Sequence, residues 1–222
     1  MRESYHDELN ATTEQIVTMA GLVRTAVRDA TEALVGADLT TAERVISDDA
    51  KVDALNDEIE QRSFQLLARQ APVAGELRTV VAVLRMTYEL SRMGDLAAHV
   101  AKIARLRYPE VAAPEPVARQ FEQMATIADS MIATAISTLE DRDADAARDL
   151  ASQDSSMDEL RREQFRMLLG DDWTYGVEKA VDTALLGRYY ERIADHAVAV
   201  GSRVIYIVTG EAPEGEDWPK AF

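Results

Sequence analysis

The sequence predicts an all-α protein built as two tandem three-helix bundles that are related by an internal repeat. The chain is rich in good helix formers and has no run of alternating β-branched residues bounded by turns. Its six prolines lie outside the long periodic segments, which they would otherwise break. The second half of the chain also repeats the apolar and acidic pattern of the first half.

In the first repeat, the spacing of apolar residues predicts three helices. An apolar stripe from Ile16 to Leu34 forms the first helix, which ends at Gly36. Asp38 is placed to cap the second helix, which ends before Pro72. The third helix runs from about residue 73 to the proline at 109.

A linker with three prolines, residues 108–116, precedes the second repeat. We expect three further helices at residues 116–140, 143–169 and 177–209, with a loop at residues 173–175. Short connections favour antiparallel neighbours within each bundle. The predicted units are a first repeat at residues 1–110, a second repeat at residues 111–210, and an acidic, mobile tail at residues 211–222.

Length and charge limit the classes of function. The 222 residues suffice for one large domain or two small ones. The 24 basic and 40 acidic residues give a net charge of -16, which argues against binding to nucleic acid or to an anionic membrane surface. The chain has no cysteine, no signal-peptide pattern and no apolar run near the roughly 20 residues of a membrane span. We therefore expect a soluble cytoplasmic protein.

The duplication preserves acidic residues. Residues 19–58 align with residues 124–163, and this alignment pairs Asp38 with Asp143, Asp49 with Asp154, and Asp53 with Asp158. After a short deletion in the second copy, Arg92 and Asp95 match Arg192 and Asp195. The chain is therefore a duplicated three-helix unit.

These acids occur at helical spacing, so that pairs of them share one helix face. Like charges four residues apart repel by a few tenths of a kcal/mol, and a bound hard cation would reverse that sign because it needs several carboxylate oxygens. The candidate metal ligands are Asp49, Asp53, Asp95, Asp154, Asp158, Glu191 and Asp195.

A solvated helix face is the alternative interpretation of the same acids. Glu191 and Asp195 lie opposite an apolar stripe, and Arg188 and Arg192 are near enough to neutralise them without a metal. His99, one turn after the acid at 95, is a weaker supplementary ligand. The sequence has no pair of core Glu-x-x-His motifs, no glycine-rich phosphate loop and no nucleophile elbow, so it predicts no catalytic residue.

Three segments resemble the signatures of the PhoU family of phosphate-uptake regulators. They are residues 69–78 and 89–95 in the first repeat and residues 191–196 in the second, and the resemblance covers residues 5–208. It implies a non-enzymatic, often dimeric cytoplasmic protein that represses the phosphate response. In that role it would connect the ATPase subunit of the phosphate ABC transporter with a membrane sensor histidine kinase, reaching the inner face of the membrane through proteins and not through lipid.

The resemblance also bears on metal binding, since some PhoU proteins hold iron or zinc clusters through Glu-x-x-x-Asp motifs. Glu191 and Asp195 satisfy this motif, whereas Ser91 stands where the first repeat would need its glutamate. No cofactor is required for the expected role, and iron or zinc at the surface carboxylates is an additional expectation. A metal-dependent enzyme, a metal store and a phosphate-binding sensor stay open as alternatives.

Overall fold

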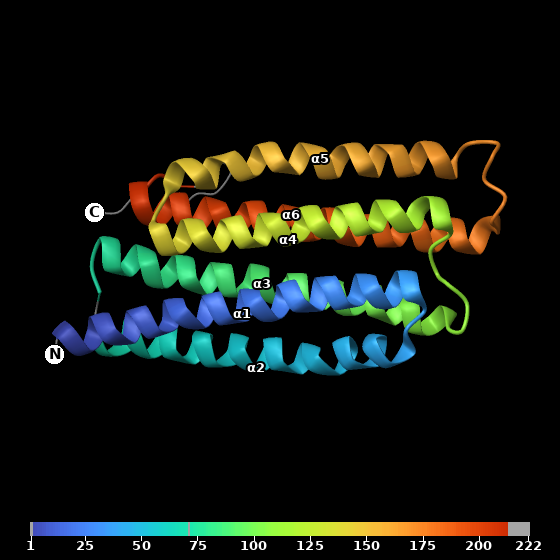
Figure 1. Cartoon of the computed structure of the whole chain (residues 1–222). Helices are drawn as coiled ribbons and strands as arrows, with labels where there is room; N and C mark the ends of the chain where they lie inside the picture. The colour runs from blue at the N-terminus through green and yellow to red at the C-terminus, as the bar shows by residue number, and fades with distance from the viewer. Residues whose placement is uncertain (1, 71, 213–222) are drawn as a thin grey trace.

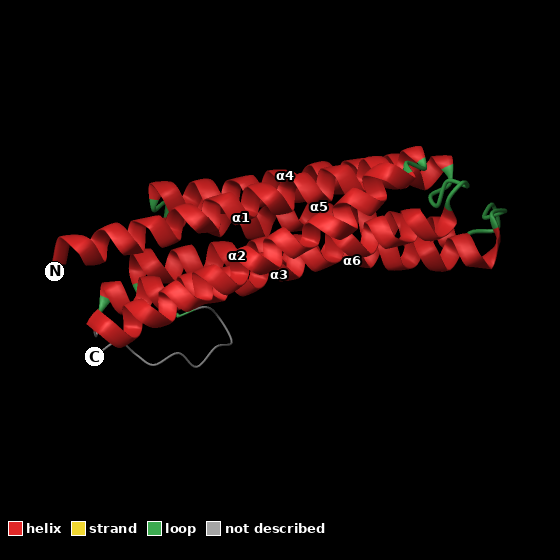
Figure 2. Ribbon diagram, turned by 90° about the horizontal axis from the view of Figure 1, so that it is seen from below, coloured by secondary structure: helices red, strands yellow, loops and turns green. Residues whose placement is uncertain are grey.

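Six helices account for nearly all of the structure. The computed structural model describes residues 2–70 and 72–212, and this part of the chain contains no strand (Figure 2). The helices are α1 (Arg2–Gly36), α2 (Leu39–Gln70), α3 (Gly75–Arg107), α4 (Glu115–Asp141), α5 (Ala144–Leu168) and α6 (Gly176–Thr209). The all-α prediction is confirmed. Residues 213–222 of the predicted tail lie outside the described residues.

The helices lie roughly parallel in layers, with α5 on one outer face and α2 on the other (Figure 1). Within the described ranges, α2 contacts only α1 and α3, and α5 contacts only α4 and α6. The two repeats meet through α1 with α4 and through α3 with α6. None of the described helices combines the length and apolar composition that a membrane span needs.

The connection between the first two helices is built in the same way in both repeats. Asp38 Oδ1 accepts a hydrogen bond of 3.1 Å from the backbone N–H three residues later, and Asp143 Oδ1 accepts two bonds of 3.0 Å from backbone N–H groups. The preceding residues, Ala37 and Arg142, both have left-handed backbones, with φ of 50° and 55°. Gly36 is the last residue of α1, so the left-handed position falls one residue later.

One continuous apolar core spans both bundles. The stripe predicted from residue 16 to residue 34 is fully or almost fully buried. Helices α3 and α6 have buried residues around most of their circumference, because each packs against its own bundle and against the other repeat. Tyr190 of α6 is fully buried and stacks on Phe121 with ring centroids 5.7 Å apart.

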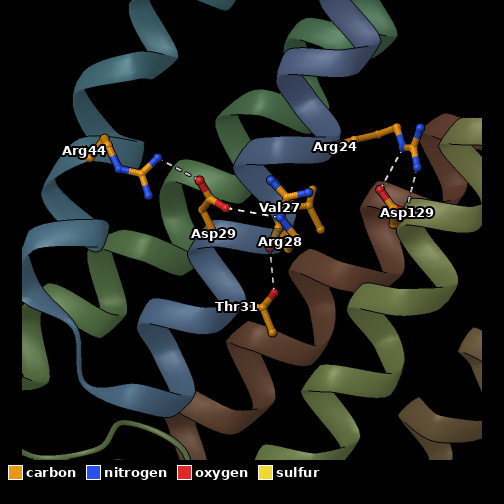
Figure 3. Close-up of polar contacts among 7 residues, drawn as sticks. All are labelled: Arg24, Val27, Arg28, Asp29, Thr31, Arg44 and Asp129. Atoms are coloured by element: carbon orange, nitrogen blue, oxygen red, sulfur yellow. Dashed lines mark hydrogen bonds and ion pairs between the residues drawn. The ribbon is translucent and has the colours of Figure 1, made fainter.

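A buried hydrogen bond joins the repeats beside this core. Thr31 Oγ1 donates its proton to the carbonyl oxygen of Val27 at 2.7 Å (Figure 3). The hydroxyl of Tyr190 lies 2.6 Å from the same Thr31 oxygen, so the tyrosine is the donor of that bond. Burial raises the pKa of Tyr190 far above its ordinary value, and the phenol therefore stays protonated.

The ion pair between α1 and α4 joins two residues at equivalent positions of the two repeats. Arg24 donates to both carboxylate oxygens of Asp129, at 2.7 and 2.9 Å (Figure 3). The two residues are 105 positions apart and so occupy the same place in their repeats. Because a residue here contacts its own counterpart, the pseudo-twofold axis that relates the bundles passes close to this pair.

Two further polar contacts join α3 to α6. Nδ1 of His196 lies 2.6 Å from Oε2 of Glu89 and donates to that carboxylate. Where α3 ends and α6 begins, Arg107 donates to Asp182 at 2.6 Å and also pairs with Glu178. One polar contact near the middle of the interface and one at its end therefore fix the register of the two antiparallel helices.

The position of Arg24 and Asp129 on the axis makes their charges exchangeable. Replacing Arg24 by Asp should lower stability by about 1 kcal/mol, a modest cost because both side chains are about two-fifths exposed, and lower Tm by about 3 °C. The exchanged double variant Arg24→Asp/Asp129→Arg should recover most of that loss. Thermal unfolding followed by circular dichroism measures both; a double variant no more stable than the single one would contradict the pairing.

The pH dependence of the same pair follows from its pKa shift. The hydrogen bond from Arg24 lowers the pKa of Asp129, so the pair stabilises the fold above the ordinary aspartate pKa of about 4. That contribution is lost as pH falls through the lowered pKa. The stability difference between the wild-type chain and Asp129→Asn should therefore be present at pH 7 and should shrink as pH falls below about 4.

Candidate functional site

In the first repeat, the predicted acids gather where α2 packs on α3. A Cβ atom at Gly94 would lie 3.3 Å from Asp49 Oδ1, which shows how closely the two helices approach here. Partial burial, together with the charges of Asp53 and Asp95, raises the pKa of Asp49. Asp95 is neutralised within its own helix by Arg92, at 2.6 Å.

The second repeat brings Asp154 and Asp158 of α5 near Glu191 and Asp195 of α6. Partial burial and the three neighbouring acids raise the pKa of Asp154. Its Oδ1 atom is buried and has no hydrogen-bond partner within the protein. Loss of hydration and the charge of Glu191 raise the pKa of Asp195 in the same way. This group therefore carries negative charge that the fold does not fully compensate.

Arginines already bind one of these acids. Arg188, one turn before Glu191, pairs with its Oε1 atom, as the sequence predicted. Arg161 reaches the other carboxylate oxygen from α5, with Nε 3.4 Å from Oε2. The sequence did not indicate this second partner, because Arg161 lies on a different helix and only the packing of α5 on α6 brings it close.

The structure thus sorts the seven predicted ligands into two electrostatic groups, one per repeat. Within the described residues, however, no three His, Asp or Glu side chains are placed so that they could hold a metal ion. His99 is exposed and stacks on Tyr189 with ring centroids 5.5 Å apart. The arrangement shows repulsion between acids that a cation would relieve, and the ligand assignments themselves stay predictions.

The second bundle buries polar residues that the sequence pattern did not indicate. Gln164 and Thr183 are fully buried, although their counterparts in the first repeat are Ile59 and Val83. A Cβ atom at Gly187 would lie only 2.2 Å from Gln164 Oε1, so a larger residue there would require the Gln164 side chain to move. Comparing the repeats position by position, and not only for identities, would have revealed these polar replacements.

A groove at the end of the second bundle is a further surface that the sequence did not reveal. It lies between α5 and α6 beside their connection and has a volume of about 440 Å³. Its lining is apolar: Phe165, Leu168, Leu169, Trp173, Gly176, Val177, Ala180, Val181 and Ala184. We call this surface the α5–α6 groove. Exposed apolar patches of this kind mark contact surfaces in soluble proteins.

The fold and these surfaces define a class of duplicated six-helix proteins with acidic groups at equivalent places in each repeat. The PhoU domain matches residues 16–104 and 121–204, one match in each repeat. The chain therefore belongs to the PhoU family, and the resemblance of its signature segments is confirmed.

Relatives and solved structures match nearly the whole chain. It is 45% identical over 213 residues, 96% of this chain and 100% of the relative, to the phosphate-specific transport system accessory protein PhoU homolog 2 of Mycobacterium tuberculosis. It is 43% identical to homolog 1 of Mycobacterium leprae, with 99% of each chain covered. The crystal structure of PhoU from Pseudomonas aeruginosa superposes with a TM-score of 0.87 at 27% identity, covering 93% of this chain and 100% of that one.

Repulsion in the second acidic group has a measurable consequence. Because the pKa of Asp154 is raised, its ionisation destabilises the folded state as pH rises from the ordinary aspartate pKa of about 4 towards the raised value, and the cost persists at higher pH. Asp154→Asn should therefore stabilise the protein at pH 7, by about 0.5 kcal/mol after allowing for solvent screening, or about 1–2 °C in Tm. The gain should vanish at about pH 3, where both states are protonated.

Asp149→Asn is the matched control for this measurement. It removes the same charge from an exposed position of the same helix, outside the acidic group. Calorimetry of both variants at pH 7 and pH 3 separates local repulsion from a general effect of net charge. Equal stabilisation by the two substitutions at pH 7 would show that repulsion within the acidic group does not contribute to the effect.

Proposed function

We propose that this protein is a non-enzymatic regulator of phosphate uptake and phosphate-starvation signalling, and that it acts as a negative regulator. In this proposal it links the ATPase subunit of a phosphate ABC transporter to a sensor histidine kinase when phosphate is plentiful. It would work in the cytoplasm, at the inner face of the membrane, by binding proteins there. A homodimer is part of the same proposal.

The match along nearly the whole chain with relatives named as accessory proteins of phosphate-specific transport systems carries this proposal. Surface properties agree with it. Long helices packed through one core present broad, rigid faces, and a strongly acidic surface suits contacts with basic patches on other proteins.

Deleting the gene tests the regulatory role directly. Transcription of a phosphate-responsive reporter should rise in medium with abundant phosphate, because the repressing contact is lost. Reintroducing the wild-type gene should restore repression. Reporter activity that stays low in the deletion strain would contradict negative regulation, and pull-down of the tagged protein identifies whether the transporter ATPase and the kinase bind it.

We also propose that the acids of the second repeat bind iron or zinc. The unpartnered, buried Oδ1 of Asp154 and the raised pKa of Asp195 support a cation there. Asp154, Asp158 and Asp195 would supply the oxygens that no arginine holds, after side-chain rotations that bring them together, because no three described acids are placed to hold a metal ion in this arrangement. Glu191 would join them if it left its arginines. The metal would neutralise this cluster and brace α5 against α6. An enzyme or a metal store built on the same carboxylates is the rival, and it requires turnover or bulk loading with metal.

Elemental analysis after loading with Fe(II) or Zn(II) tests the metal proposal. Glu191→Gln/Asp195→Asn should lower the metal bound per chain, because it removes the Glu-x-x-x-Asp motif. The matched variant Asp49→Asn/Asp95→Asn, in the repeat that has Ser91 in place of the glutamate, should change it less. Bound metal that is unaffected by the first variant would refute this site.

A further inference from the structure

The two bundles differ in how completely their ends are covered. Helices α3 and α6 are almost equally long, at 33 and 34 residues. Their companions are not, since α1 and α2 have 35 and 32 residues whereas α4 and α5 have 27 and 25. The second bundle therefore lacks about two helical turns on each of the two helices that would cover the start of α6.

In the first bundle, the additional turns of α1 and α2 cover part of the beginning of α3. Leu9 of α1 and Leu66 of α2 pack against Val80 of α3 in a small apolar cluster, and Val80 is fully buried. The counterpart of Asn10 is Glu115, where α4 begins, so the second bundle has no helical turn in the place of Leu9.

The α5–α6 groove lies at the equivalent position of the second bundle. Ala180, the counterpart of Val80, lines this groove. Around it, Leu169, Val177 and Val181 are 84%, 80% and 51% exposed. The connection between α2 and α3 and the connection between α5 and α6 lie at opposite ends of the molecule (Figure 1). The extended helices of the first bundle therefore do not cover the groove.

The walls of the groove are held in place by their own contacts. The guanidinium of Arg161 lies over the ring of Phe165, 4.1 Å from its centroid. The indole N–H of Trp173 donates to the carbonyl of Gly176 at 2.9 Å, and its ring meets Tyr175 edge to face at 5.1 Å. A preformed groove loses little conformational entropy when it is filled.

Charge at the rim indicates what fills it. The lining holds no charged side chain, and the adjoining connection carries Asp171 and Asp172, both exposed and without an ion-pair partner in the described chain. Two nearby cations are engaged, Lys179 with Glu110 and Arg161 with the acid at 191, whereas Arg166 beside Phe165 is exposed on α5. An apolar groove with a free acidic rim suits an apolar stripe flanked by basic residues.

We propose that the α5–α6 groove binds an amphipathic helix of a partner protein, with Lys or Arg beside its apolar stripe. About two to three turns would suffice, since this helix takes the place that the first turns of α1 occupy on the first bundle. A second copy of this chain fits less well, because its own charge of -16 would meet the acidic rim. The inference rests on the geometry of the groove and goes beyond the regulatory role.

Fluorescence anisotropy with the full-length protein tests this site. The probe is a labelled amphipathic helix of Leu and Lys, and a Leu and Glu peptide of the same pattern is its control. Val177→Ser/Val181→Ser, at two exposed positions, should weaken binding of the Leu and Lys peptide by about tenfold. Asp171→Asn/Asp172→Asn should make binding weaker and less dependent on salt.

Val73→Ser/Leu77→Ser is the matched control variant, since it changes exposed apolar residues at the corresponding end of the first bundle. It should leave the affinity unchanged. No detectable binding, or equal loss in both serine variants, would overturn the proposal. Analytical ultracentrifugation adds another test: wild-type self-association abolished by Val177→Ser/Val181→Ser would assign the groove to a second copy instead.

Discussion

Four inner helices have to bury two faces at once, and the rest of the structure follows from this constraint. Helices α1, α3, α4 and α6 each pack within their own bundle and also against the other repeat, so that one apolar core runs through both. Polar side chains at this interface meet in hydrogen-bonded pairs, such as Tyr190 with Thr31 and His196 with Glu89. An unpaired polar group there would cost more than the contact contributes.

The outer helices are free of this constraint and have the highest proportion of charged residues among the six described helices. Since α2 and α5 each touch only two helices, much of their surface faces water and tolerates the acids that recur in both repeats. Where these helices meet α3 and α6, partial burial and mutual repulsion raise the pKa of Asp49, Asp154 and Asp195. The shared core thus keeps the repeats alike, and their outer surfaces are where they have diverged.

That divergence concerns function more than fold. The second bundle has shorter α4 and α5, polar Gln164 in place of Ile59, and arginines on Glu191. The shorter helices expose apolar surface, Gln164 places a polar side chain inside the bundle, and the arginines compensate the charge of Glu191. An accessory protein benefits from this separation of roles, because one face can change its partner while the symmetric scaffold keeps its stability.

The sequence by itself determined the helices, the duplication, the cap at Asp38 and the family, because these depend on local periodicity, on backbone hydrogen bonding and on aligned residues. It also placed the acids on the correct helices. Only the tertiary structure decided that Arg161 binds Glu191 and that a groove opens between α5 and α6. Those features depend on where separate helices end relative to one another in space, which no spacing along one helix encodes.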